Sequence, residues 1–385
     1  MELTLFIDHQ CNLRCAYCYN GDKFSRPMSA ETMRRAVDLA LRRPGDDLHV
    51  SFFGGEPLLH LDLLRETVAY VEAAVAARPA PRPSLLFVLN TNGTLLGDEA
   101  LGLLGPPRRW SAYVSLDGPR ELHDRYRVNA AGRGSFDAAM AGIERLRAAA
   151  VPFAVTSVFR PSTAYALGDA LRAILPLGPF KVLLSPNYRD EWTEEAIADL
   201  RRGLAAAGEA WMELFRAGRA LPVSPLHAKI LSHLKGAMPC PSRCLLGGGE
   251  LSVAPTGRLY PCAQMVGQDD DGRCVVGHVE RGVDLEALVR LRQERARVEQ
   301  ICAPCARRDR CQSQCGCRHL ALTGRLGEIT AALCEIEAAF IDEADRVAET
   351  LYAEGCTAFL DYYYRRAWAL APGASVAAGR RAPEQ

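Results

Sequence analysis

The feature that most limits the fold is an alternation of strand-like and helical runs through residues 2–184. Each strand-like run is apolar or β-branched and is followed by a Gly, Pro or Asn turn. Strands are expected at 3–7, 48–53, 85–90, 112–116, 153–159 and 180–184, and helices at 30–43, 58–77, 136–149 and 164–175. Six βα repeats predict a parallel sheet with helices outside it, too few for a closed eight-stranded barrel. We therefore expect an α/β fold, a partial (β/α)6 TIM-like barrel with its mouth at the carboxyl ends of the strands.

The rest of the chain changes character several times. After a barrel over 1–190, residues 191–239 read as two bridging helices. Residues 240–340 are rich in Cys and Gly and have little apolar periodicity, so this module would need metal to fold. A C-terminal helix is expected within 341–370. The Ala, Gly, Arg and Pro residues of 371–385 have nothing to bury and predict a disordered tail.

Charge and cysteine usage narrow the classes of function. Lys and Arg total 46, as do Asp and Glu, so a formal net charge of zero gives no electrostatic case for a nucleic-acid or membrane partner. No signal peptide or apolar run of membrane-spanning length is present, which predicts a cytoplasmic protein. Thiols stay reduced there, so the 14 cysteines are expected to bind metal rather than to form disulfides.

Three of these cysteines follow the first strand directly. Cys11, Cys15 and Cys18 form a C-x3-C-x2-C run. Three thiolates can hold three corners of a 4Fe–4S cluster and leave the fourth iron open to chelate a cofactor. The carboxyl end of a barrel strand is also where chemistry is placed in βα barrels. From spacing alone, a zinc site lacking one ligand and an electron-transfer cluster completed from elsewhere remain open.

The run, with Tyr17 before its last cysteine, resembles the signature of the radical S-adenosylmethionine (SAM) superfamily. The resemblance implies that the open iron binds the amino and carboxylate groups of SAM. It implies that one electron then cleaves SAM to a 5′-deoxyadenosyl radical, which abstracts hydrogen from a substrate. Tyr17 is expected to pack beside the adenine.

The motif at the end of the second strand resembles the family's Gly-Gly-Glu-Pro sequence. Gly54 and Gly55 allow the backbone to approach a ligand closely, and Glu56 is an acceptor for a cationic group. The resemblance implies that this motif holds the SAM amino group. The run 90–94 also resembles the family, and we divide its interpretation equally between turn chemistry and a pocket wall.

Two more segments match SAM-contacting positions. Ser115 and Asp117 alternate on one side of the fourth strand and match contacts to the ribose and carboxylate of SAM. Arg127 ends a run that resembles a His-Asp-x-x-Arg motif of peptide-modifying members, and it could pair with the SAM carboxylate. A surface ion pair is the alternative for Arg127. No catalytic acid or base is identified.

The second cysteine region resembles the SPASM domain, a module that carries two auxiliary 4Fe–4S clusters in many radical SAM maturases. The resemblance assigns Cys240, Cys244, Cys262 and Cys315 to one cluster, and Cys302, Cys305, Cys311 and Cys334 to the other. Cys240 is the weakest assignment, because some members leave that iron open. Two structural zinc sites are the alternative. Cys274, Cys317 and Cys356 are left over, and Cys317 could replace Cys315 as a ligand or act as a catalytic thiol.

The combined resemblance implies an enzyme that modifies a peptide or protein side chain, with oxidation or cross-linking assisted by the auxiliary clusters. The expected electron donor is a ferredoxin or flavodoxin. Because the first strand begins at residue 2, a leader peptide is expected to dock elsewhere or on a separate protein.

Several alternatives to this function remain. They are a small-molecule radical SAM dehydrogenase, an electron carrier, a zinc-stabilised binding module and a sulfatase maturase. Sulfatase maturases carry an Asp base after the Cys262 equivalent, so Ala263 disfavours that activity. Asp269, Asp270 and Asp271 are expected to form a solvated acidic turn.

Overall fold

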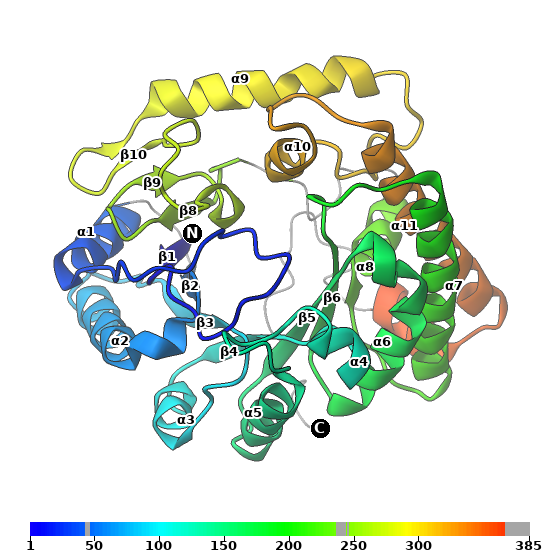
Figure 1. The fold of residues 1–385 in the computed structure, drawn as a ribbon, viewed down its shortest axis with the longest axis horizontal. Coiled ribbons are helices and arrows are strands. Elements are labelled where there is room, and N and C mark those ends of the chain that lie inside the picture. Colours follow the sequence, from blue (N-terminus) through cyan, green and yellow to red (C-terminus); the bar gives the residue numbers. More distant parts are fainter. Residues whose placement is uncertain (43–46, 236–243, 245, 366–385) are drawn as a thin grey trace. The chain divides into compact units, whose positions relative to one another are not determined.

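The structure is a computed structural model, and it describes residues 1–42, 47–235, 244 and 246–365 (Figure 1). The chain divides into two compact units. The first unit contains 1–116, 120–153 and 245–296, and the second contains 117–119, 154–244 and 297–385. Cys240 and the expected tail over 371–385 lie outside the described residues.

The first unit is built on a mainly parallel sheet. Strands β1 (Glu2–Phe6), β2 (Asp47–Phe53), β3 (Ser84–Thr91) and β4 (Trp110–Ser115) pair in that order. The sheet extends past β1, where β8 (Glu250–Val253) pairs with β1 in parallel and β9 (Leu259–Tyr260) pairs with β8 in antiparallel. The row Leu5, Phe52, Leu89 and Ala112 is fully buried and forms the core under the helices.

The helices of this unit lie outside the strands (Figure 1). They are α1 (Ala30–Leu41), η1 (Pro57–His60), α2 (Leu61–Ala76), α3 (Asp98–Leu104), α4 (Arg120–Asp124) and α5 (Phe136–Ala148). Ser29 ends the loop before α1, because its hydroxyl accepts a hydrogen bond from the Thr32 N–H at 3.1 Å. The expected strands and helices of this half are confirmed to within a few residues, and α3 and the short α4 were not expected.

The second unit holds three parallel strands in the order β5 (Phe153–Phe159), β6 (Lys181–Pro186) and β7 (Val223–Ser224). The elements η2 (Pro161–Ala166), α6 (Leu167–Ile174) and η3 (Leu175–Leu177) follow β5. The expected bridging helices are α7 (Glu194–Arg216) and α8 (Leu226–Leu234), and both pack against α11 (Ala331–Ala353). Phe215 on α7 packs edge-on against Phe359 at 5.5 Å, which closes an aromatic core.

The C-terminal helix differs from its expected bounds. Thr330 accepts a hydrogen bond from the Leu333 N–H, so α11 begins at Ala331, before 341. It ends at Ala353 because Gly355 has a φ of 64°, which reverses the chain. Short α12 (Thr357–Leu360) and a π-helical turn, η5 (Asp361–Arg365), replace the expected continuation.

The cysteine-rich segment contains more regular structure than its sequence indicated. It holds η4 (Ala263–Met265), the hairpin of β10 (Gly277–His278) and β11 (Gly282–Val283), α9 (Leu285–Cys302) and α10 (Gly316–Thr323). Helix α9 runs from the first unit into the second. Its buried residues are few, among them Leu288, Leu291 and Val298, so its apolar pattern is weak. Across the described residues, no helix combines the length and the apolar character needed to cross a membrane.

Candidate functional site

A loop that leaves β1 carries the three N-terminal cysteines, and Asp8 organises its base. The buried Asp8 carboxylate accepts hydrogen bonds from the backbone N–H groups of His9 and Arg26, both at 2.6 Å. It also contacts His60 Nε2 at 2.7 Å, at the end of η1. A single carboxylate therefore joins both ends of the loop to the start of α2, and this fixes where the cysteines project.

The cysteines of this loop are partly buried. Cys11 Sγ accepts from the Leu13 N–H at 3.4 Å and lies 3.8 Å from Asn92 Nδ2, while Lys23 Nζ lies 3.0 Å from Cys18 Sγ. Burial is the main cause that raises the pKa of Cys11, to about 11, so a free thiol there stays protonated. Three sulfur ligands beside N–H donors and an ammonium group fit an anionic iron–sulfur cluster, which deprotonates the thiols that bind it.

A ring of amide and hydroxyl groups joins this loop to the end of β3. Asn92 Nδ2 donates to Asn12 Oδ1 at 2.8 Å, and Asn12 Nδ2 donates to Thr94 Oγ1 at 2.8 Å. The Thr94 hydroxyl donates to Asn92 Oδ1 at 2.7 Å and closes the ring. The 90–94 run thus forms both a turn and a contact with the cysteine loop. Sequence reasoning missed Asn12 and Lys23, and no local signal marks either residue.

The two glycines of the second motif pack against the same loop. A Cβ atom on Gly54, whose φ is +125°, would lie 2.4 Å from the Asp8 carbonyl oxygen, and one on Gly55 would lie 2.0 Å from that of Gln10. The Gly55 N–H donates to the Asp8 carbonyl at 2.8 Å. The sequence argument assigned this close approach to a ligand, and the structure supplies the cysteine loop itself as a partner.

Glu56 is 1% exposed, and both of its carboxylate oxygens are hydrogen-bonded within the chain. Oε1 accepts from the Leu58 N–H at 3.1 Å and from the Thr91 hydroxyl at 2.9 Å, and Oε2 accepts from the Asn92 N–H at 2.8 Å. Burial raises the pKa of Glu56 to about 7, although these hydrogen bonds act in the opposite direction. Glu56 therefore ties the start of η1 to the end of β3.

Arg127 is 5% exposed, so the alternative of a surface ion pair is wrong. Its guanidinium group lies 5.2 Å from the centre of the Tyr17 ring, a cation–π contact that joins two predicted SAM-contacting residues. Buried His123 contacts the Ser135 hydroxyl at 3.0 Å, and that hydroxyl donates to the Arg127 carbonyl at 2.8 Å. The His-Asp-x-x-Arg run is therefore held rigidly.

Ser115 and Asp117, the two SAM-contacting residues predicted at the end of the fourth strand, belong to different units. Ser115 is half-buried at the end of β4 in the first unit. Asp117 belongs to the second unit, where its Oδ1 accepts from the Val158 N–H at 2.9 Å. Their expected placement on one side of a ligand stays a prediction.

The second unit contains the four cysteines predicted for one auxiliary cluster, Cys302, Cys305, Cys311 and Cys334. Cys302 Sγ lies 3.6 Å from Ser313 Oγ, and the Ser313 N–H donates to Cys311 Sγ at 3.3 Å. Cys334 interacts electrostatically with both Cys302 and Cys305. Within the described residues, no three His, Cys, Asp or Glu side chains are arranged to hold a single metal ion.

The other predicted cysteine set is divided. Cys244 and Cys315 are hydrogen-bonded in the second unit, and Cys317 Sγ lies 3.2 Å from Cys315 Sγ. Cys262 belongs to the first unit. Of the remaining cysteines, Cys274 is buried and Cys356 is half-buried. The second unit thus brings the unassigned Cys317 into contact with an expected ligand.

The position after Cys262 also lies beside a carboxyl group. The Ala263 N–H donates to Glu250 Oε1 at 3.1 Å, and burial raises the pKa of Glu250 to about 7. The expectation of a solvated acidic turn is wrong for Asp269, which is 3% exposed. Its carboxylate accepts hydrogen bonds from Tyr260 at 2.7 Å and Thr256 at 2.5 Å, so it is a structural acceptor.

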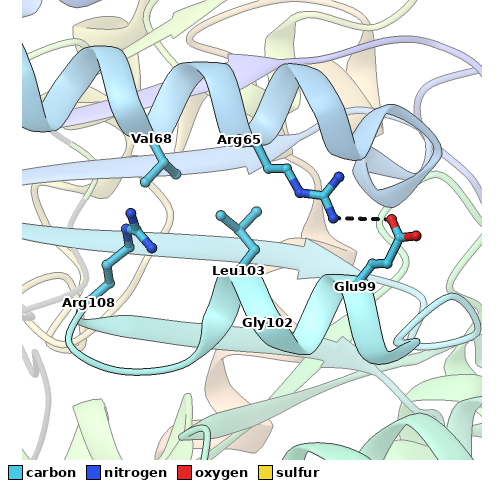
Figure 2. Close-up of a pocket in the computed structure, with 6 residues that line it drawn as sticks. All are labelled: Arg65, Val68, Glu99, Gly102, Leu103 and Arg108. Atoms are coloured by element: carbon cyan, nitrogen blue, oxygen red, sulfur yellow. Dashed lines mark hydrogen bonds and ion pairs between the residues drawn. The ribbon is translucent and has the colours of Figure 1, made fainter.

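A pocket of about 360 Å³ lies between α2 and α3 (Figure 2). Its lining includes Val68, Leu103 and Arg108, and an ion pair between Arg65 and Glu99 at 3.1 Å crosses one end. None of the predicted site residues that the structure describes lines it, so the pocket and the cysteine loop are separate features.

Comparison with known proteins finds relatives among radical SAM proteins and sulfatase-maturating enzymes. Residues 7–164 match the model of the Radical SAM superfamily. A cysteine-type anaerobic sulfatase-maturating enzyme of Clostridium novyi is 25% identical over 66% of this chain and 70% of its own. A serine-type enzyme of Klebsiella aerogenes is 25% identical over 79% and 76%. An uncharacterised Methanocaldococcus jannaschii protein is 25% identical, over 50% of this chain and 65% of its own length.

Solved structures show that the fold is shared. The structure of anSMEcpe with bound AdoMet (SAM) has a TM-score of 0.74 at 18% identity, covering 91% of this chain and 98% of its own. Streptococcus suis SuiB bound to S-adenosylmethionine has a TM-score of 0.61 at 14% identity, covering 86% and 76%. The match to the Radical SAM superfamily thus covers residues 7–164, and the solved structures add a shared fold. The resemblance to radical SAM and sulfatase-maturating enzymes that the sequence motifs predicted is confirmed by these matches.

Proposed function

We propose that this enzyme modifies a side chain of a peptide or protein substrate. The observation that carries the proposal is the fixed loop of Cys11, Cys15 and Cys18, which offers sulfur ligands beside N–H donors and an ammonium group. Peptide substrates are supported by the sulfatase-maturating relatives and by structures of anSMEcpe with a Cp18Cys peptide and of SuiB bound to the precursor peptide SuiA.

Different residues of the first unit would hold different parts of the cluster and of SAM. When bound, SAM and its cluster supply a 5′-deoxyadenosyl radical for hydrogen abstraction. Asp8 and the Asn92 ring hold the cysteine loop in place, and Cys11, Cys15 and Cys18 of that loop would bind the cluster. Arg127 would bind the SAM carboxylate, and Tyr17, which it contacts, would pack beside the adenine. Gly54, Gly55 and Glu56 would hold the amino group.

We further propose that residues 240–340 form a SPASM module with two auxiliary 4Fe–4S clusters. The contacts of Ser313 with Cys302 and Cys311 support one ligand set, Cys302, Cys305, Cys311 and Cys334. The contact between Cys244 and Cys315 supports part of the other. The auxiliary clusters would take up the electron released when the substrate is oxidised, and a ferredoxin or flavodoxin would supply electrons to the enzyme.

The test is anaerobic incubation of reconstituted enzyme with SAM, dithionite and candidate peptides. We expect 5′-deoxyadenosine and a change in peptide mass, and neither product from a Cys15→Ala variant. Deoxyadenosine formation with every peptide unchanged, and with a small metabolite consumed, would establish the small-molecule dehydrogenase instead. Absence of deoxyadenosine from cluster-replete protein would contradict the proposal and favour an electron carrier.

Sulfatase maturation is a second candidate, because it is the activity named for several relatives. Ala263 cannot accept the proton that an Asp accepts at this position. Glu250, which accepts a hydrogen bond from the Ala263 N–H and has a pKa of about 7, offers a replacement. A peptide carrying a sulfatase active-site sequence would then gain an aldehyde that a hydrazine probe detects, and Glu250→Gln would abolish that product.

A further inference from the structure

Three charged side chains meet in the interior of the second unit. Lys229 on α8 is 0% exposed, and its Nζ donates to Oε2 of Glu337 on α11 at 2.6 Å. Arg318 on α10 donates to Oε1 of the same carboxylate. The side chains of Lys229, Glu337 and Arg318, here called the charge triad, are 0%, 1% and 14% exposed. Water therefore screens these charges little.

The charge triad carries one more positive charge than negative. Burial by itself would raise the pKa of Glu337, but Arg318 and Lys229 outweigh burial and lower it to about 2, so the carboxylate is ionised. The neighbouring Arg310 is paired with Asp345 at 2.8 and 2.5 Å, so that pair is neutral and supplies no compensating anion. A buried excess charge is costly unless an opposite charge lies nearby.

The charge triad is joined to segments that carry the predicted cysteine ligands. Glu337 Oε2 accepts from the Gln312 N–H at 2.8 Å, and Gln312 follows Cys311, whose Sγ accepts from the Ser313 N–H at 3.3 Å. Arg318 follows Cys317, whose Sγ lies 3.2 Å from Cys315 Sγ, and the Arg318 guanidinium group lies 4.7 Å from the centre of the Tyr188 ring. The charge triad is therefore connected to residues that adjoin cysteines of both predicted sets.

We propose that the charge triad is a shared counter-charge for the two proposed auxiliary clusters, both of which take cysteines from the second unit, and that it raises their reduction potentials. This inference rests on the proposed function. One-electron reduction of a cluster adds one negative charge and breaks no bond, so a buried positive charge stabilises the reduced form more than the oxidised form. Second-sphere charge and burial are the means by which proteins set such potentials.

The test changes the net charge of the triad in both directions. The background is the full chain with Cys11, Cys15 and Cys18 all replaced by Ala, which removes the SAM-binding cluster. Lys229→Met brings the triad to neutrality, and Glu337→Gln brings it to two positive charges. In a redox titration followed by electron paramagnetic resonance, we expect the first to lower the potential of at least one cluster and the second to raise it. Each shift should be about tenfold in the equilibrium constant, or about 59 mV.

Lys181→Met is the matched control, because it removes a lysine of the same unit whose charge acts on His227. Iron and sulfide analysis of each protein tests whether the auxiliary clusters are present, separately from whether the charge triad sets their potentials. Background protein without iron and sulfide would refute the auxiliary clusters, and the charge-triad proposal with them. Normal cluster content with potentials equal to those of the control would overturn the charge-triad proposal alone. If Glu337→Gln does not fold, Lys229→Met decides, because it leaves a neutral pair of Arg318 and Glu337.

Discussion

Replacement of Glu56 by Gln should change how stability depends on pH. Burial raises the pKa of Glu56 from its ordinary value of 4.5 to about 7 in the folded chain. Between these values the folded protein binds more protons at this position than the unfolded chain, so stability falls as pH rises through the folded pKa. From pH 5 to pH 8 the loss amounts to about 2.5 kcal/mol, because one pKa unit corresponds to about 1.36 kcal/mol.

Glutamine cannot titrate, so the variant lacks this loss. Urea unfolding of both proteins at pH 5 and pH 8, under anaerobic conditions and with equal m-values, measures the difference. We expect the stability of Glu56→Gln relative to the natural chain to improve by about 2.5 kcal/mol between the two pH values.

The matched control is Glu99→Gln, which removes an exposed carboxylate paired with Arg65 and should show no such change. If the relative stability of Glu56→Gln changes by less than about 0.5 kcal/mol, the reasoning is wrong. The hydrogen bonds from Leu58, Thr91 and Asn92 then keep Glu56 an ordinary, ionised carboxylate.

Three further predictions concern the first unit. Cys15→Ala should abolish 5′-deoxyadenosine formation and lower the iron content by about a third, because one cluster of three is lost; unchanged iron would contradict this. Arg127→Lys should weaken SAM binding about tenfold in equilibrium dialysis, because lysine cannot form two parallel hydrogen bonds; an equal loss in the exposed control Arg125→Lys would refute it. Lys23→Met should lower the potential of the SAM-binding cluster, since Lys23 Nζ lies 3.0 Å from Cys18 Sγ, whereas Lys23→Arg should retain it. A potential unaffected by Lys23→Met would show that this ammonium group does not act on the cluster.

Most of the fold could be predicted from patterns among residues that are close together in the sequence. The strands β1 to β6 follow apolar runs bounded by turn residues, and their positions were predicted to within two residues. Helix α3 was not predicted because seven residues are too few to display an amphipathic period. Helix α9 was not predicted because half of its positions are charged or polar. Strand β8 has only four residues, and it is a strand because it pairs with β1, which no local pattern predicts.

The sequence by itself determined the alternation of strands and helices, the cysteine spacings and the motifs after the first, second and fourth strands, because each is encoded by neighbouring residues. Only the tertiary structure decided which distant side chains meet. Asn12 with Asn92, the Ala263 N–H with Glu250, and Lys229 with Glu337 are joined by hydrogen bonds that no local pattern specifies. These side chains are buried only when segments far apart in the chain pack together and exclude water. This packing sets the pKa values and the pairing of charges on which the proposed chemistry depends.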